Sequence, residues 1–282
     1  LVGTLFSRAG YEILFVDAAP DIVAALRQRH GYRVVVKDEL PPGAPAVLEV
    51  RGADAIDARD ADAVADAVAR ADLIGTSVGA NVLPIVLRSM APGLARRTRP
   101  VSILFCENLH GVVELARTTL GANLPAGFDL AGRVGLVATS IGKMVPIMPA
   151  EIRARDPLEV WGEAYNRIIA DRHAFVGPVP GIEGLDLKAN FRAYVDRKLY
   201  IHNLGHAVCA CFGYLHGCTR IAEAMALGEV ARAARAAMEA SARALTIRYP
   251  GEFTDANQAE HVADLLRRFR NQALGDTVFR VG

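Results

Sequence analysis

The stretch DLKANFRAYVDRKLYIHNLGHAVCAC, residues 186–211, places apolar side chains at intervals of three and four residues. This spacing predicts one long amphipathic helix, with Asp186 as its N-cap. The apolar positions that recur are Leu187, Phe191, Tyr194, Val195, Ile201 and Cys209.

Lys198 lies within the apolar stripe of this expected helix. At about 100° per residue from Leu187, Lys198 falls at about 20°, while His206 falls at about 100° and Asn203 at about 160°, along one flank. Burial lowers the pKa of a lysine, so a buried Lys198 can act as a base. An amide and an imidazole on the next turns can bind an oxygen that alternates between hydroxyl and carbonyl, as alcohol oxidation requires. The alternative is a lysine that reaches past the stripe into water, beside a packing histidine and a capping asparagine.

The composition is that of a globular enzyme. Of the 282 residues, 52% are hydrophobic and 22% charged, and the formal net charge is +1. This balance argues against nucleic acid or an acidic membrane as partner. No signal peptide is visible, no apolar run is long enough to span a bilayer, and the four cysteines do not form a disulfide framework in a chain of this size, so we expect a cytoplasmic protein. The chain opens without methionine and ends without a clear stop, and we expect both ends to be trimmed.

The first residues read as the second half of a Rossmann mononucleotide unit. A helix at 1–9 is followed by an apolar strand at 11–16, the acid Asp17 and a helix that starts at Pro20. In such a unit the acid bonds the adenosine ribose and favours NAD over NADP. The glycine loop that holds the pyrophosphate is then expected just before residue 1. Without that loop, Asp17 is equally consistent with a surface turn.

Further strands are expected at 32–37, 46–50, 72–77, 101–106, 134–139 and 158–164, with helices at 60–71 and 82–95. Ser77, Val78 and Gly79 form a small turn at the end of one strand, where backbone can approach a cofactor. Glu107 and Asn108 emerge from the end of another. Asn108 either donates to a substrate oxygen or caps the helix expected near His110.

Two domains are expected, with residues 176–184 (VGPVPGIEG) as the hinge. The first, residues 1–180, is an α/β domain with a Rossmann-type, mostly parallel sheet. The second, residues 181–282, is a mainly α-helical substrate domain. Everything beyond the hinge reads as helical, including 218–227, 229–249 and 257–270.

With these residues in place, the chain resembles the polyol-specific long-chain dehydrogenases and reductases. RKLYIHNLGHA at 197–207 fits that family's K-x4-N-x2-H signature at Lys198, Asn203 and His206. Further matches are AGYEILFVD (9–17), TSVG (76–79), CEN (106–108), DPLEV (156–160) and PGIEGLDL (180–187). The spacing is similar to the shorter, sugar-phosphate branch of mannitol-1-phosphate 5-dehydrogenases. Where the family carries an Asp-Arg pair after a strand, this chain has Gly142 and Lys143.

The resemblance implies an NAD-dependent, metal-free interconversion of mannitol 1-phosphate and fructose 6-phosphate in the cleft between the domains. It implies that Lys198 is the general base, that Asn203 and Asn108 hold the developing oxyanion, and that His206 positions the same oxygen. The implied cofactor-binding residues are Asp17, Ser77, Val78, Gly79 and Glu107. The implied assembly is a monomer or small homo-oligomer.

Three other interpretations stay open. The substrate can be a sugar acid or an unphosphorylated polyol. The reaction can instead be a metal-dependent hydrolysis, because His202 and His206 are four residues apart, a spacing that can bind a metal, although the glutamate of the usual helical motif is missing and no third ligand is evident. If the chain truly starts at Leu1, it can be a non-catalytic relative, because dinucleotide binding needs the glycine loop.

Overall fold

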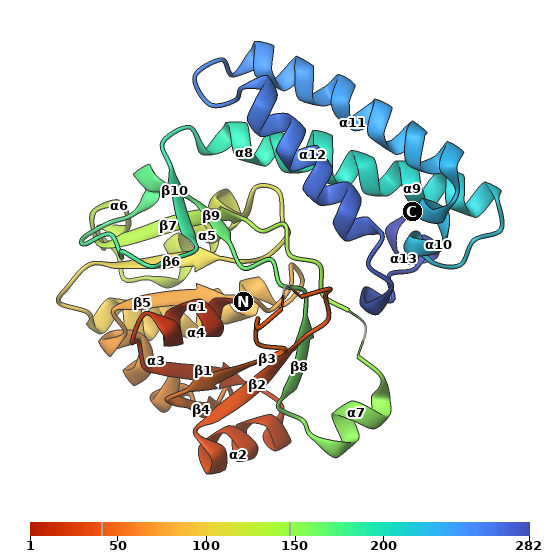
Figure 1. The fold of residues 1–282 in the computed structure, drawn as a ribbon. Coiled ribbons are helices and arrows are strands. Elements are labelled where there is room, and N and C mark those ends of the chain that lie inside the picture. Colours follow the sequence, from red (N-terminus) through yellow and green to blue (C-terminus); the bar gives the residue numbers. More distant parts are fainter. Residues whose placement is uncertain (41, 147) are drawn as a thin grey trace.

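The computed structural model describes residues 1–40, 42–146 and 148–282. An α/β part formed by the first two thirds of the chain lies beside a bundle of helices formed by the last third (Figure 1). The strands are β1 Ile13–Asp17, β2 Gly31–Val36, β3 Val47–Arg51, β4 Ala53–Asp57, β5 Leu73–Thr76, β6 Val101–Phe105, β7 Val134–Ser140, β8 Glu159–Gly162, β9 Ile168–Asp171 and β10 Leu185–Lys188.

Seven helices belong to the α/β part of the described chain: α1 Val2–Arg8, α2 Pro20–Arg29, α3 Ala61–Arg70, α4 Leu83–Arg96, α5 Val112–Asn123, α6 Leu130–Arg133 and α7 Ala150–Arg155. The bundle contains α8 Phe191–Arg197, α9 Leu204–Leu215, α10 Ile221–Ala226, α11 Gly228–Arg248, α12 Asp255–Phe269 and α13 Val278–Val281. The expected Rossmann-type domain and helical domain are therefore confirmed.

The described strands form three hydrogen-bonded groups. Five strands run in the order β10-β9-β7-β6-β5, three in the order β3-β2-β8, and β1 pairs with β4. The pairs are parallel except β7 with β9 and β2 with β3. Parallel strands send their carboxyl ends to the same edge of a sheet, so the turns after β5 and β6 lie side by side.

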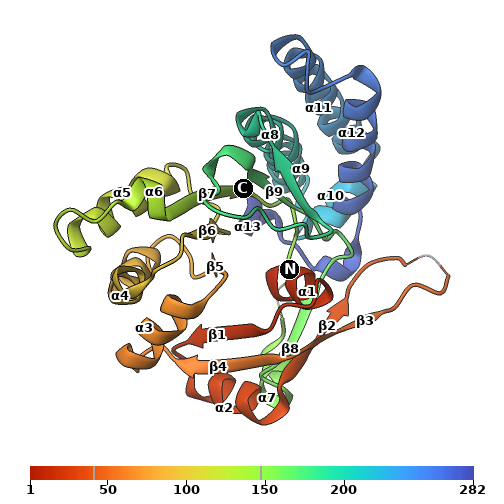
Figure 2. The same cartoon turned by 90° about the vertical axis from the view of Figure 1, so that its left-hand side faces the viewer.

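Helices cover both faces of the five-stranded sheet (Figure 2). Apolar residues of α3, α4 and α5 pack on one face, against β6 and β7. Leu5 and Phe6 of α1 pack with Leu104 and Val137, which point to the other face. All five residues of β6 are buried, which explains why its sequence, VSILF, lacks polar alternation.

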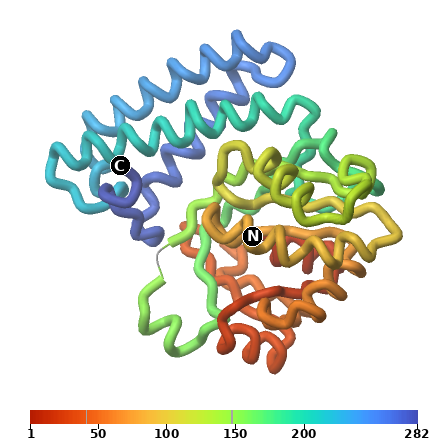
Figure 3. Tube along the Cα trace, turned by 180° about the vertical axis from the view of Figure 1, so that it is seen from behind, coloured from red at the N-terminus to blue at the C-terminus, as the bar shows by residue number. Residues whose placement is uncertain are grey.

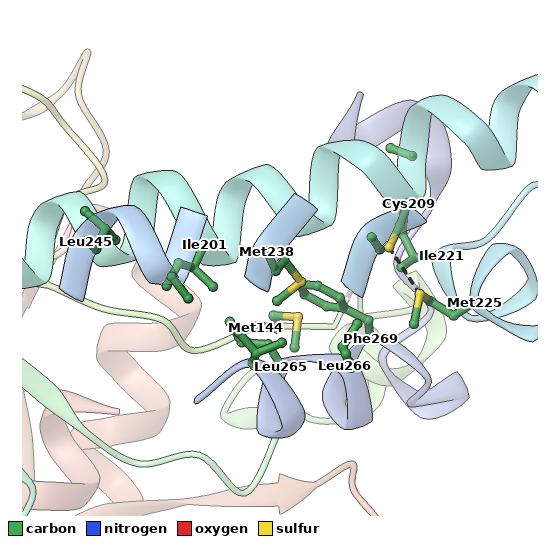
Figure 4. Close-up of a cluster of buried hydrophobic side chains, with 14 of the residues drawn as sticks. Met144, Ile201, Cys209, Ile221, Met225, Met238, Leu245, Leu265, Leu266 and Phe269 are labelled. Atoms are coloured by element: carbon green, nitrogen blue, oxygen red, sulfur yellow. Dashed lines mark hydrogen bonds between the residues drawn. The ribbon is translucent and has the colours of Figure 1, made fainter. Parts of the chain in front are cut away.

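The bundle has its own core. Ile201, Cys209, Met238, Leu265 and Phe269 are almost fully buried between α9, α11 and α12 (Figure 4). Seen from behind, α11 and α12 run alongside the segment from α8 to α9 (Figure 3). No described helix combines the length and apolar character needed to cross a membrane.

The prediction of one helix over residues 186–211 is wrong in two respects. Residues 185–188 are β10, which pairs with β9, so Asp186 is a strand residue and Asn190 is the N-cap of α8. The expectation that everything beyond the hinge is helical fails for the same strand. The helix itself changes type, because a π-helix, Lys198–Asn203, joins α8 to α9.

Candidate active site

Lys198 joins the two domains through one hydrogen bond. Its Nζ donates to Oδ1 of Asn108 at 2.9 Å, from the π-helix to the turn after β6. Burial lowers the pKa of Lys198 below its ordinary value of 10.5. An amine with a lowered pKa next to an amide is the arrangement expected of a base that acts on an alcohol.

The π-helix changes how Lys198 and Asn203 are related. In an α-helix, residues five apart point about 140° away from each other. In a π-helix the hydrogen bonds join residues five apart, and here the Leu204 N–H donates to the Leu199 carbonyl. Asn203 therefore lies nearer the face of Lys198 than the α-helical count predicts, and its side chain is exposed.

His206 lies one turn beyond the π-helix and makes its contacts inside the bundle. Its Nε2 is 3.3 Å from Oδ2 of Asp276, and its ring stacks on Phe269 with centroids 4.8 Å apart. Burial alone would raise the pKa of Asp276, but the close approach of His206 and the hydrogen bonds from Arg280 outweigh it and lower that pKa. His206 is thus oriented by Asp276, and its described contacts do not include Lys198.

His202 occupies the interior between His206 and the α/β domain. Its ring lies edge-on to Phe269, and only 7% of the residue is exposed. Burial, with the charge of Arg268 next in effect, keeps the pKa of His202 well below 6.5, so the imidazole is neutral at pH 7. The described residues contain no group of three or more His, Cys, Asp or Glu side chains placed to hold a metal.

The expected ribose-binding acid is at the carboxyl end of β1. Oδ1 of Asp17 accepts the N–H of Ala19 at 2.8 Å, which fixes the carboxylate at the start of α2. Within the described residues its Oδ2 has no hydrogen-bond partner. An acceptor held at a strand end, with one oxygen available, fits the ribose hydroxyls of a dinucleotide.

Hydrogen bonds to the buried carboxylate of Glu107 fix the turn after β5. This carboxylate, 8% exposed, accepts from Oγ1 of Thr76 at 2.7 Å and from the N–H of Val78 at 3.0 Å. Ser77, Val78 and Gly79 remain exposed, and Gly79 has a φ of +83° with open space around it. The structure therefore gives Glu107 a supporting position under the turn, with the turn backbone facing outwards.

Gly142 and Lys143 belong to a buried polar junction between the domains. Nζ of Lys143 donates to the carbonyls of Glu163 and Tyr165, both at 2.6 Å, and burial lowers the pKa of Lys143 to about 8. Arg268 of α12 donates to both oxygens of Glu163 and to the Gly142 carbonyl. The side chains of Arg268 and Glu163 are 2% and 0% exposed.

The end of α12 also contacts the loop after β2. Nδ2 of Asn271 donates to the Lys37 carbonyl at 2.7 Å, and Arg267 lies 3.6 Å from Asp38. The carboxyl ends of β2, β7 and β8 are thus attached to one helix of the bundle. These attachments set how the bundle presents Lys198 to the strand ends.

Sequence reasoning missed Asp276, Glu163 and Arg268. Each pairs with a residue far away in the chain, and none lies in a recognisable motif. The DTVFR and RRFR segments read as ordinary helix ends, so only the tertiary structure reveals these three residues.

The comparisons with known proteins cover nearly the whole chain. The family model for the mannitol dehydrogenase Rossmann domain matches residues 1–184, and that for the mannitol dehydrogenase C-terminal domain matches residues 190–282. A mannitol-1-phosphate 5-dehydrogenase of Brevibacillus brevis is 33% identical over 286 residues, covering 99% of this chain and 72% of the relative.

Solved structures show the same fold at low sequence identity. A D-sorbitol dehydrogenase in substrate-free form superposes with a TM-score of 0.78 at 16% identity, covering 99% of this chain and 68% of that one. The Pseudomonas fluorescens mannitol 2-dehydrogenase, in a ternary complex with NAD and D-mannitol, gives a TM-score of 0.73 at 16% identity, with the same coverage.

Proposed function

The chain belongs to the mannitol dehydrogenase family, and from this membership we propose that it interconverts mannitol 1-phosphate and fructose 6-phosphate, with Lys198 as the general base. The family assignment makes the chain an NAD-dependent polyol dehydrogenase. The 33% identity to a mannitol-1-phosphate 5-dehydrogenase supports the phosphorylated substrate.

The observation that carries the role of Lys198 is its hydrogen bond to Asn108. The contact of 2.9 Å joins the helical domain to the turn after β6, on the same sheet edge as the turn after β5. Burial lowers the pKa of Lys198, so a larger fraction of its amine is neutral near physiological pH than for a lysine in water. This position supports the proposal that a substrate bound between the domains contacts both Lys198 and the turn after β5.

In the oxidation direction, neutral Lys198 accepts the proton of the reacting hydroxyl. NAD, when bound, supplies the acceptor for the hydride. In the reduction direction, protonated Lys198 donates to the oxygen as it gains negative charge. Asn108 accepts from Lys198 through Oδ1, which leaves its amide N–H groups to donate to that oxygen.

The other candidate residues have supporting roles in this proposal. Asn203 offers a second amide donor from the end of the π-helix, and His206, held by Asp276, orients the oxygen. Asp17 accepts from the ribose, and the backbone of residues 77–79 lies against the cofactor.

The test is Lys198→Ala, assayed by NADH oxidation with fructose 6-phosphate. We expect turnover to be abolished while NADH binding, followed by fluorescence, stays nearly unchanged. Arg235→Ala is the control and should match wild type, because Arg235 is an exposed cation on α11 whose ion-pair partner is Glu239. Turnover of Lys198→Ala within a few-fold of wild type means that another group is the base.

A further inference from the structure

Arg197 is a half-buried cation that directly precedes the proposed base in the chain. It is the last residue of α8. Its guanidinium carbon lies 4.9 Å from the centroid of the Tyr194 ring and 5.2 Å from that of Phe253. Burial lowers the pKa of Arg197, so the environment disfavours its positive charge. Cation–π contacts with two rings compensate only part of this loss of hydration.

Arg268 is a buried arginine of the same protein whose loss of hydration is compensated by a carboxylate. Burial would lower the pKa of Arg268, but the hydrogen bonds and charge of Glu163 outweigh it and raise that pKa. Arg197 has no such partner, because no carboxylate of the described residues lies within 4 Å of it. The nearby Asp186 is instead paired with Arg167 at 3.0 Å.

The guanidinium of Arg197 remains open to a ligand. Its nitrogens make no hydrogen bond to a described residue, and they are not fully buried. They are therefore accessible to solvent. An accessible guanidinium with aromatic walls and no counter-ion is suited to bind an anion that arrives from solution, through two parallel hydrogen bonds.

We propose that Arg197 binds the anionic end of the substrate, and that this end is a phosphate monoester. The inference rests on the proposed function, since it assumes that the reacting oxygen of the same substrate is bound at Lys198. In fructose 6-phosphate four carbons and an oxygen separate the carbonyl carbon from the phosphorus, so the cation for the phosphate belongs in the same cleft as the base but away from the reacting oxygen. Arg197 and Lys198 are consecutive residues in the helix, so their side chains point about 100° apart and can reach two different groups of one substrate.

The experiment measures the binding of fructose 6-phosphate, fructose and fructuronate by calorimetry with oxidised NAD present, because this form of the cofactor cannot reduce a ketose and no heat of turnover is released. In Arg197→Met, which keeps the packing against the rings, we expect the Kd for fructose 6-phosphate to rise about 10- to 100-fold, the value of a hydrogen bond to a charged group. The Kd for fructose should change less than about twofold, as expected for an unaltered contact. Arg197→Lys should recover part of the loss, and Arg235→Met, an exposed arginine on α11, should match wild type.

The role of Arg197 would be overturned if Arg197→Met raised the Kd for fructose and for fructose 6-phosphate equally. It would also be overturned if wild-type protein bound fructose 6-phosphate no more tightly than fructose. A loss confined to fructuronate would overturn the phosphate and identify a carboxylate instead. Failure of the proposed function is separate and shows as wild-type protein that oxidises no NADH with any of these ketoses. The binding comparison decides on Arg197 in either case.

Discussion

The buried ion pair between Arg268 and Glu163 gives a stability prediction that can be worked from the structure. The pair joins α12 to the end of β8, with N–O distances of 2.8 Å and 2.5 Å and side-chain exposures of 2% and 0%. In Arg268→Met, Glu163 keeps the Met144 N–H as a partner but loses its only buried cation within 4 Å among the described residues. Breaking a buried pair from one side costs about 3–5 kcal/mol, so we expect the free energy of unfolding to fall by that amount.

A double-mutant cycle separates the pair from its surroundings. The assay is urea unfolding followed by circular dichroism for wild type, Arg268→Met, Glu163→Gln and the double variant. The double variant removes both charges and leaves no isolated ion, so its loss should be smaller than the sum of the two single losses by about 2 kcal/mol or more. Arg235→Met serves as the surface control and should stay within about 0.5 kcal/mol of wild type.

Two results would refute this reasoning. One is an Arg268→Met variant as stable as the surface control, which would mean that the carboxylate finds water or another cation at no cost. The other is strict additivity, which would mean that each side chain stabilises the protein independently of its partner.

Four further predictions concern the site and its surroundings. Because the pKa of Lys198 is lowered, the kcat of polyol oxidation should rise with pH through a pKa below 10.5, and the kcat of ketose reduction should fall through the same pKa. A pH profile of kcat with no inflection below 10.5 would contradict the role of Lys198 as the base. Asn203→Ala should lower kcat more than it raises KM, because its contact strengthens as charge develops on oxygen, and steady-state kinetics with equal effects would indicate mere substrate binding. Asp17→Ala should weaken the preference for NAD over NADP in kcat/KM, whereas an unchanged ratio would remove Asp17 from the ribose. Burial lowers the pKa of His261 to about 3, so protonation opposes folding: stability is complete above pH 6.5 and falls as the pH drops towards 3. His261→Gln should flatten this decline in urea titrations at several pH values, and an unchanged slope would contradict the assignment.

The fold was predictable where hydrophobic patterning was strong. The buried strand VSILF and the amphipathic helix at 61–70 lie where the sequence places them. The strands β4, β9 and β10 were missed because ADAID, IIAD and LDLK are short and carry acids at or near their ends. Strands of this kind form because a neighbouring strand supplies hydrogen bonds, which a local pattern does not record.

The site was partly predictable. The K-x4-N-x2-H spacing led to Lys198, and the residue after a strand led to Asn108, although their 2.9 Å contact connects segments ninety residues apart. The helical angles assigned to Asn203 and His206 assumed a regular α-helix, and the π-helix invalidates that count beyond Lys198. A π-helix has no reliable sequence signal, since it depends on the packing of the surrounding helices.

The π-helix takes up one extra residue between α8 and α9. This extra residue brings Asn203 towards Lys198, and beyond it residues of α9, among them Cys209 and Ala210, face the bundle. Deleting one residue between 198 and 203 would restore regular α-helical winding and, because the wide turn only takes up that extra residue, would leave α9 facing its neighbours as before. The extra residue therefore sets the angle between Lys198 and Asn203, while the packing of α9 in the bundle does not depend on it.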